Sequence, residues 1–139
     1  MNPIVLLRLA SVVALIQGGA HTLLVVFGAP THGPTEVAVV EAMKGHRFNF
    51  LGSARSYWDF YFGYALFAAF NCAIEAVLFW QLARMGGEPA SLVKPVIALF
   101  VVANLGYAIL AWKYFFLTPI VPDLAIAICL GLTLMSASR

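Results

Sequence analysis

The stretch YWDFYFGYALFAAFNCAIEAVLFWQL, residues 57 to 82, decides the fold of this chain. Only Asp59 and Glu75 are charged within it, and aliphatic and aromatic side chains fill most of the other positions. A helix needs about 20 apolar residues to cross the hydrocarbon of a bilayer, because each residue adds about 1.5 Å to its length. The stretch therefore predicts a transmembrane helix.

The composition of the whole chain agrees with this prediction. Of its 139 residues, 63% are hydrophobic and 10% are charged, whereas about a quarter of the residues in soluble domains are charged. So few charged side chains cannot cover a soluble surface. The formal net charge of +2 is small and scattered along the chain, so we expect no nucleic-acid partner.

Three further apolar runs are long enough to cross a membrane. Because a bilayer offers no water to the backbone, all four runs should be helices, and four strands could not close a barrel. We predict an all-α integral membrane four-helix bundle that forms a single transmembrane domain over residues 1–139. Its helices should cover about residues 4–28, 57–82, 93–117 and 120–136.

The first run has a second interpretation. LASVVALIQGGA, residues 9–20, combines an apolar segment with small residues, as a secretory signal peptide does. The apolar character continues, however, through LLVVFG at residues 23–28. A retained helix therefore fits the run better.

A long connection, about residues 29–56, joins the first two helices. Its first part predicts an amphipathic helix at about residues 35–45 that lies at the membrane interface. Thr35 can cap the start of this helix and Gly45 can end it.

The second part of the connection, HRFNFLGSAR, should also lie at the interface. Arg47 and Arg55 can meet phosphates or acidic partners there. We expect Ser56 to cap the transmembrane helix that follows.

Ionisable residues inside the spans need partners, because a charged group at the bilayer centre is costly. We counted residues inward from Gly28 and Tyr57, which should mark one interface. The count places Arg8 and Glu75 at the same depth, and Asp59 and Lys113 near the first interface. We therefore predict two candidate ion pairs, Arg8 with Glu75 and Asp59 with Lys113, or alternatively a lysine that reaches the headgroups by itself.

A candidate intramembrane polar site consists of Gln17, His21, Asn71 and Asn104. Such side chains commonly hold membrane helices together by hydrogen bonds. The alternative is a pocket near the bilayer midplane in which His21 carries protons or binds a cofactor.

No cofactor or catalytic residue can be named from the sequence. A haem with two histidine ligands would need a second histidine at the depth of His21, and His32 and His46 both lie in the connection. CxxC, HExxH, P-loop and GxGxxG motifs are absent, so we predict no metal site.

Several short segments resemble a known group of proteins. GGAHT at the end of the first helix, AMK in the connection and RSYWDFYFGY at residues 55–64 resemble an uncharacterised family of small bacterial four-helix membrane proteins, loosely DoxX-like. The most specific of these segments is RSYWDFY. The resemblance implies a membrane-embedded four-helix fold, and it transfers no catalytic residue.

A second resemblance is weaker. Glu75, Asn104 and Trp112 are residue types that the sterol-isomerase-like membrane fold uses around a cationic intermediate. Their spacing departs from that pattern, and the chain is one helix short.

We therefore expect a multi-pass protein of the bacterial inner membrane that binds a lipid-like ligand or serves as an accessory subunit of a membrane complex. Its expected partners are membrane lipids, further copies of the chain or a larger complex. The alternative is a small membrane enzyme that acts on an apolar substrate, with His21 and Asp59 or Glu75 as acid and base.

Overall fold

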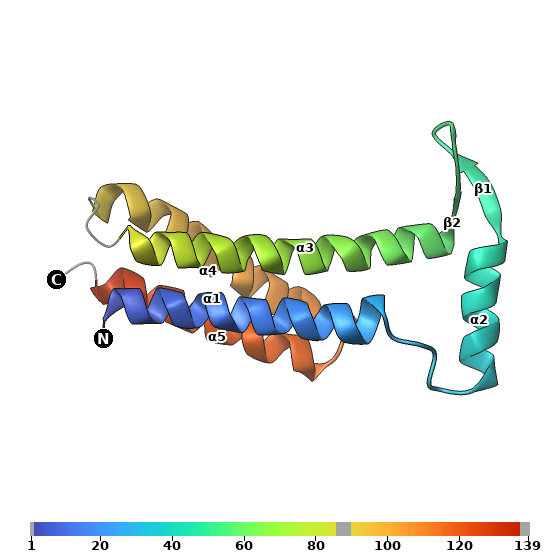
Figure 1. The fold of residues 1–139 in the computed structure, drawn as a ribbon, viewed down its shortest axis with the longest axis horizontal. Coiled ribbons are helices and arrows are strands. Elements are labelled where there is room, and N and C mark those ends of the chain that lie inside the picture. Colours follow the sequence, from blue (N-terminus) through green and yellow to red (C-terminus); the bar gives the residue numbers. More distant parts are fainter. Residues whose placement is uncertain (1, 86–89, 137–139) are drawn as a thin grey trace. The chain divides into compact units, whose positions relative to one another are not determined.

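The computed structural model describes residues 2–85 and 90–136 and is mostly helical (Figure 1). Four helical segments are long and apolar enough to cross a membrane. This result confirms the all-α class. In chain order the elements are α1 (Pro3–His21), the π-helical turn η1 (Thr22–Val26), α2 (Pro34–Gly45), the strands β1 (Arg47–Phe50) and β2 (Ser53–Ser56), α3 (Tyr57–Arg84), α4 (Ala90–Tyr114) and α5 (Leu117–Ser136).

The end of the first span differs from the continuous helix that we predicted. After His21 the backbone widens into the π-helical turn η1, in which the Phe27 N–H donates to the Thr22 carbonyl over 3.1 Å. The hydroxyl of Thr22 donates to the Gly18 carbonyl one turn back. A side chain at position 28 would collide with the Leu24 carbonyl, so only glycine fits where the chain leaves this turn.

Two helix starts test the capping predictions. Ser56 caps α3 as expected, because the Asp59 N–H donates to its Oγ over 3.2 Å and the Ser56 N–H donates back to the Asp59 carboxylate over 2.8 Å. This exchange is a capping box with Asp in the third helical position. Thr35 was the wrong cap for α2, which already begins at Pro34 after Gly33. Proline suits the first helical position because its missing N–H would be unsatisfied there anyway.

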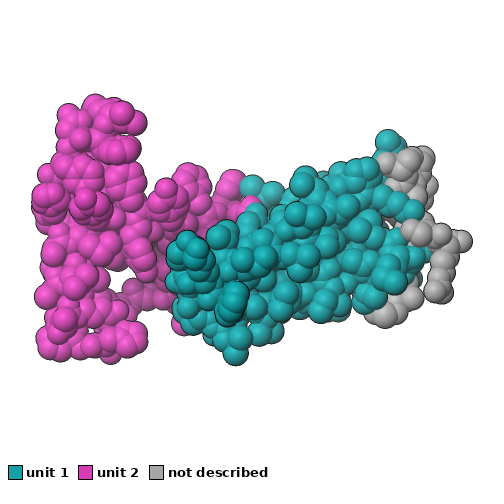
Figure 2. All heavy atoms as spheres, turned by 180° about the vertical axis from the view of Figure 1, so that it is seen from behind, with its two compact units in different colours: residues 1–17, 72–139 teal, residues 18–71 magenta. Residues whose placement is uncertain are grey.

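The chain contains two compact units, coloured separately in Figure 2. The first unit comprises Met1–Gln17 and Cys72–Arg139, and the second comprises Gly18–Asn71. The first therefore holds most of α1, the second half of α3, and α4 and α5.

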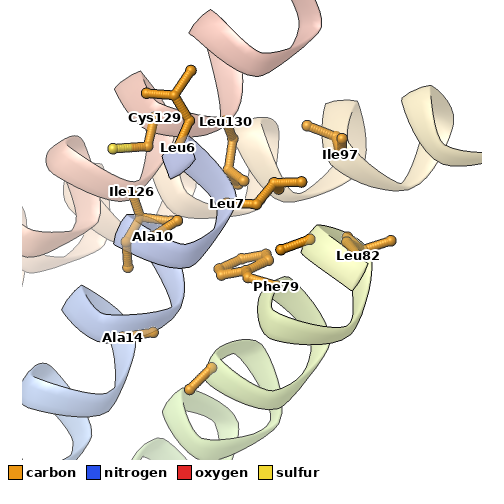
Figure 3. Close-up of a cluster of buried hydrophobic side chains, with 12 residues drawn as sticks. Leu6, Leu7, Ala10, Ala14, Phe79, Leu82, Ile97, Ile126, Cys129 and Leu130 are labelled. Carbon is orange, nitrogen blue, oxygen red and sulfur yellow. The ribbon is translucent and has the colours of Figure 1, made fainter. Parts of the chain in front are cut away.

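In the first unit, side chains from all four helices converge on one core (Figure 3). Phe79 is fully buried there, and its ring meets Phe100 edge-on at a centroid distance of 5.4 Å. Small residues such as Ala10 and Ala76 line the same core and let the helices approach closely. Many large apolar side chains point outward instead, for example Ile16 and Phe70 of the two units, with 65% and 66% of their surface exposed. Small residues inside and large apolar ones outside suit a surface that faces lipid.

The second unit contains a β-hairpin that the sequence analysis did not predict. β1 and β2 pair antiparallel, with Phe50 opposite Ser53. Leu51 and Gly52 form the turn, and both have positive φ, at 50° and 84°. Such values define the primed turns that match the twist of a hairpin, although Asn-Gly is the usual sequence. The side chain of Asn49 accepts the Gly52 N–H over 2.9 Å and so stabilises the turn.

Aromatic rings hold this hairpin against the first turns of α3. Phe48 lies 5.0 Å from Tyr57 and 6.2 Å from Phe60 between ring centroids, and Phe50 meets Phe60 edge-on at 5.4 Å. His46 stacks on Tyr57 at 6.1 Å. The hairpin is therefore packed at the start of a membrane span.

Candidate functional site

The first unit buries polar side chains from each of its four helices. Glu75 of α3, Asn104 of α4 and Asp123 of α5 keep 3%, 0% and 4% of their surface exposed. Burial of polar groups on this scale is costly in a membrane protein and marks a candidate site. We call these three residues, together with Ser11 and the half-buried Gln17 of α1, the polar set.

Gln17 and Asp123 form one pair within the polar set. The Gln17 side-chain amide donates to Asp123 Oδ1 over 2.8 Å, and so joins α1 to α5. We expected Gln17 to form a polar contact inside the bundle, but we did not predict a role for Asp123. The signal was present in the sequence, because Asp123 is the acidic residue inside the run at 120–136.

Asn104 and Glu75 form the second pair. Asn104 Nδ2 lies 3.3 Å from Glu75 Oε2 and 3.0 Å from the Phe100 carbonyl, so it donates to two acceptors at once. Asn104 Oδ1 is fully buried and accepts no hydrogen bond from the described residues. Rotating the amide by 180° would place its oxygen against the same two acceptors, so the orientation is fixed. The polar set thus holds an acceptor to which no described residue donates.

The hydroxyl of Ser11 fixes the register between α1 and α3 in this unit. It donates to the Ala76 carbonyl over 2.6 Å. Because the two helices run antiparallel, Arg8 lies opposite the turn that contains Trp80, one turn beyond Glu75. The Arg8 guanidinium accordingly lies 5.4 Å from the centre of the Trp80 ring. Arg8 thus makes a cation–π contact with Trp80, and its predicted ion pair with Glu75 stays a prediction.

Cys72 lies at the edge of the polar set. Its half-buried thiol is within electrostatic reach of both Glu75 and Asp123. The two carboxyl groups therefore act on one common region of the unit. This region reaches the surface of the unit at Gln17 and Cys72, because neither residue is fully buried.

The remaining predicted intramembrane residues lie in the second unit. His21 is half-buried, and its Nε2 lies 3.0 Å from the Ala65 carbonyl. Since a carbonyl only accepts, Nε2 is the donor and the His21 ring fastens the end of α1 to α3. Asn71 is also half-buried on α3. Of the four residues in the predicted polar site, Gln17 and Asn104 thus join the polar set of the first unit.

The predicted ion pair of Asp59 with Lys113 also stays a prediction. Asp59 is exposed and takes part in the capping box with Ser56. The Lys113 ammonium lies 5.2 Å from the centre of the Tyr114 ring. Asp59 belongs to the second unit and Lys113 to the first.

The two predicted interfacial arginines meet on the hairpin. Arg47 and Arg55 each donate to the Ala54 carbonyl, over 3.1 and 2.9 Å. Both side chains are exposed. Two guanidinium groups therefore share a single acceptor.

The carboxylate of Glu36 contacts His32, which lies just before α2. The carboxylate accepts the backbone N–H of His32 over 2.6 Å and also contacts His32 Nδ1 over 3.2 Å. The backbone hydrogen bond lowers the pKa of Glu36 below its ordinary value of 4.5. This contact caps the turn before α2 and belongs to the folded state at neutral pH.

Comparison of the chain with protein-family models, with curated proteins and with solved structures gives no match. Among residues 2–85 and 90–136, no group of three or more His, Cys, Asp or Glu side chains is arranged to hold a metal ion. The chemistry of the polar set and of the hairpin is therefore the basis for a functional argument.

Proposed function

We propose that this integral membrane protein binds a lipid-like molecule whose polar head donates hydrogen bonds, such as an alcohol, a phenol or an amine. The observation that carries the proposal is Asn104 Oδ1, a buried acceptor that receives no hydrogen bond from the described residues. A buried acceptor without a donor costs about 1–3 kcal/mol. A ligand that supplies the donor would remove this cost.

The carboxylates of the polar set also favour a ligand that donates hydrogen bonds. Asp123 offers two carboxylate oxygens and receives the Gln17 amide on one of them. Glu75 Oε2 already accepts from Asn104. The set is thus rich in acceptors, and a head that brings donors complements it better than a phosphate or a carboxylate would.

A molecule dissolved in the bilayer would approach the polar set beside Gln17 and Cys72. Gln17 and Cys72 are half-buried and lie at its edge. The surrounding surface is apolar, with exposed side chains such as Ile16 and Ile74. An apolar tail can stay in the lipid while the head reaches the acceptors.

The simpler alternative is that the polar set has a purely structural role and only holds the helices together. A protein of that kind would serve as an accessory subunit, and its partners would be further copies of the chain or a larger membrane complex. We also propose, on the resemblance of RSYWDFY alone, that the protein belongs with the loosely DoxX-like proteins of the bacterial inner membrane.

An enzyme with His21 as proton carrier is the second candidate. Its support is that Nε2 of His21 is engaged with Ala65, which leaves Nδ1 for proton transfer. Asp59 supports it less, because its carboxylate serves the capping box. The variant His21→Ala tests this candidate. If the variant keeps the bound molecules and the growth phenotype of the wild type, the enzyme hypothesis fails.

Native mass spectrometry after mild extraction tests the proposal. The wild-type protein should retain an endogenous molecule or an added donor amphiphile, 1-dodecanol or dodecylamine, in preference to methyl laurate, which has no donor. Asn104→Leu should lose this preference, whereas Thr133→Val should keep it. Thr133 is a suitable control because it is buried and its hydroxyl donates to the Cys129 carbonyl of its own helix.

Two results would count against the proposal. If the wild type binds methyl laurate as well as it binds 1-dodecanol, the acceptors do not select the ligand. If it is extracted with a polypeptide partner and no small molecule, the accessory role replaces the binding role. Because the probe series uses the wild type, the proposal stays testable even if Asn104→Leu does not fold.

A further inference from the structure

The hairpin of the second unit offers a site that is independent of the polar set. Its turn fixes the pattern of backbone hydrogen bonds. Phe50 and Ser53 close a two-residue turn and form a hydrogen-bonded pair, so the next pair, Asn49 with Ala54, turns its backbone groups outward. The Ala54 carbonyl therefore lies on the open edge of β2.

Arg47 and Arg55 converge on this edge. Their nitrogens lie 3.1 and 2.9 Å from the Ala54 oxygen, so the two donor nitrogens are within about 6 Å of each other. Like charges at that distance repel each other. Each guanidinium has five N–H donors, and one of them donates to the Ala54 carbonyl. The other N–H groups can donate to a further acceptor.

The charges around the two arginines leave the edge positive. Asp59 acts electrostatically on both arginines, but its carboxylate also accepts the Ser56 N–H. Lys44 adds nothing here, because it pairs with Glu41 over 3.1 Å and lies 5.0 Å from the Trp58 ring centre. One net positive charge with several free donors remains between Arg47 and Arg55.

The position of the hairpin along the chain gives its depth. β2 ends at Ser56, and the span of α3 begins at Tyr57. The rings of Phe48 and Phe50 pack on Tyr57 and Phe60, so the hairpin cannot swing far from the start of this span. If α3 crosses the bilayer from Tyr57, the arginines lie at the level of the lipid phosphates.

We propose that Arg47 and Arg55 together bind the phosphate of an anionic lipid headgroup. A phosphate offers several oxygens, and a guanidinium binds such oxygens in pairs through its fork of N–H groups. Its negative charge also relieves the repulsion between the two arginines. Lipid is the favoured source because the site adjoins a membrane span.

Titration in detergent, followed by native mass spectrometry, tests this proposal. The probes are dioleoyl phosphatidate, dioleoyl phosphatidylglycerol and dioleoyl phosphatidylcholine, with inorganic phosphate as competitor. Arg47→Gln and Arg55→Gln should each weaken binding of phosphatidate roughly five-fold, and the double variant should weaken it more. Arg84→Gln, which makes the same charge change at the other end of α3, should bind as the wild type does.

Lysine variants separate the fork from simple charge. Arg47→Lys with Arg55→Lys keeps both charges but loses the paired N–H geometry, so its affinity should fall between those of the wild type and the double Gln variant. The circular dichroism spectrum should match that of the wild type in every variant.

Three results would overturn the proposal. The first is equal binding of phosphatidate by the wild type and the double Gln variant. The second is competition by millimolar inorganic phosphate that abolishes lipid binding, which would make free phosphate the ligand. The third is an equal loss in Arg84→Gln, which would show a general charge effect. None of these results bears on Asn104, so the proposed function succeeds or fails separately.

Discussion

The contact between Gln17 and Asp123 gives the sharpest quantitative prediction. Replacing Gln17 by Leu removes the donor to a carboxyl group that is 4% exposed, and replacing Asp123 by Leu removes the acceptor. Each single variant leaves a polar group inside the bundle without its partner. The double variant Gln17→Leu, Asp123→Leu leaves neither.

The size of the effect follows from the geometry. Hydrogen bonds between membrane helices contribute about 0.6 kcal/mol on average and about 1.7 kcal/mol at most. The 2.8 Å distance and the burial of Asp123 place this bond near the upper end of that range. We therefore expect the free energy of unfolding of the double variant to be about 1–2 kcal/mol higher than the value obtained by adding the two single effects.

Equilibrium unfolding in mixed micelles of dodecyl sulfate and a mild detergent measures these free energies. The control cycle pairs Gln17→Leu with Thr133→Val, because the Thr133 hydroxyl donates to a carbonyl of its own helix. That cycle should be additive within about 0.5 kcal/mol. Additivity of the Gln17 and Asp123 changes as well would refute the contact and the arrangement of α1 against α5.

Two further predictions concern the second unit. Leu51 has a φ of 50°, which leucine adopts only with strain. Leu51→Asn should therefore slow hydrogen exchange of the hairpin amides, and faster exchange would contradict the turn. The second prediction concerns pH. The folded-state pKa of Glu36 is lowered, so its hydrogen bond to His32 stabilises the fold above pH 4.5 and is lost as the pH falls through the lower folded value. The His32 amide resonance should show an acidic titration step with a midpoint below 4.5 in the wild type, and Glu36→Gln should lack that step. A midpoint of this step at or above 4.5 would contradict the assignment.

The spans could be predicted from the sequence because their length and apolar character are local properties. The run at 57–82 became α3, with bounds Tyr57–Arg84. Ser56 was predictable as its cap for the same reason, since a cap depends on residues within one turn.

The register between helices could not be predicted, because it depends on packing. Counting from the ends of two runs places Arg8 and Glu75 at one depth, but it does not say which helix faces meet, as the Ser11 hydroxyl and the Ala76 carbonyl do. The π-helical turn after His21 also changes the rise per residue, which no count at 1.5 Å per residue includes.

The hairpin and Asp123 were missed for different reasons. RFNFLGSARS has leucine where a primed turn usually has asparagine or glycine, so its turn signal is weak. Asp123 follows Pro122 near the start of a span, where a carboxylate usually faces the headgroups. In the structure it is buried instead and accepts the Gln17 amide from α1.

The central claim is that polar side chains from different helices meet inside the first unit and that the described residues leave Asn104 Oδ1 without a donor. Solid-state nuclear magnetic resonance in lipid bilayers can measure the dipolar coupling between ¹⁵N in the Asn104 side chain and ¹³C in the Glu75 carboxyl group. With Nδ2 at 3.3 Å from Oε2, a coupling that is weaker than that of a bonded pair but still measurable is predicted. Absence of that coupling in a folded sample would contradict the arrangement on which the proposed function rests.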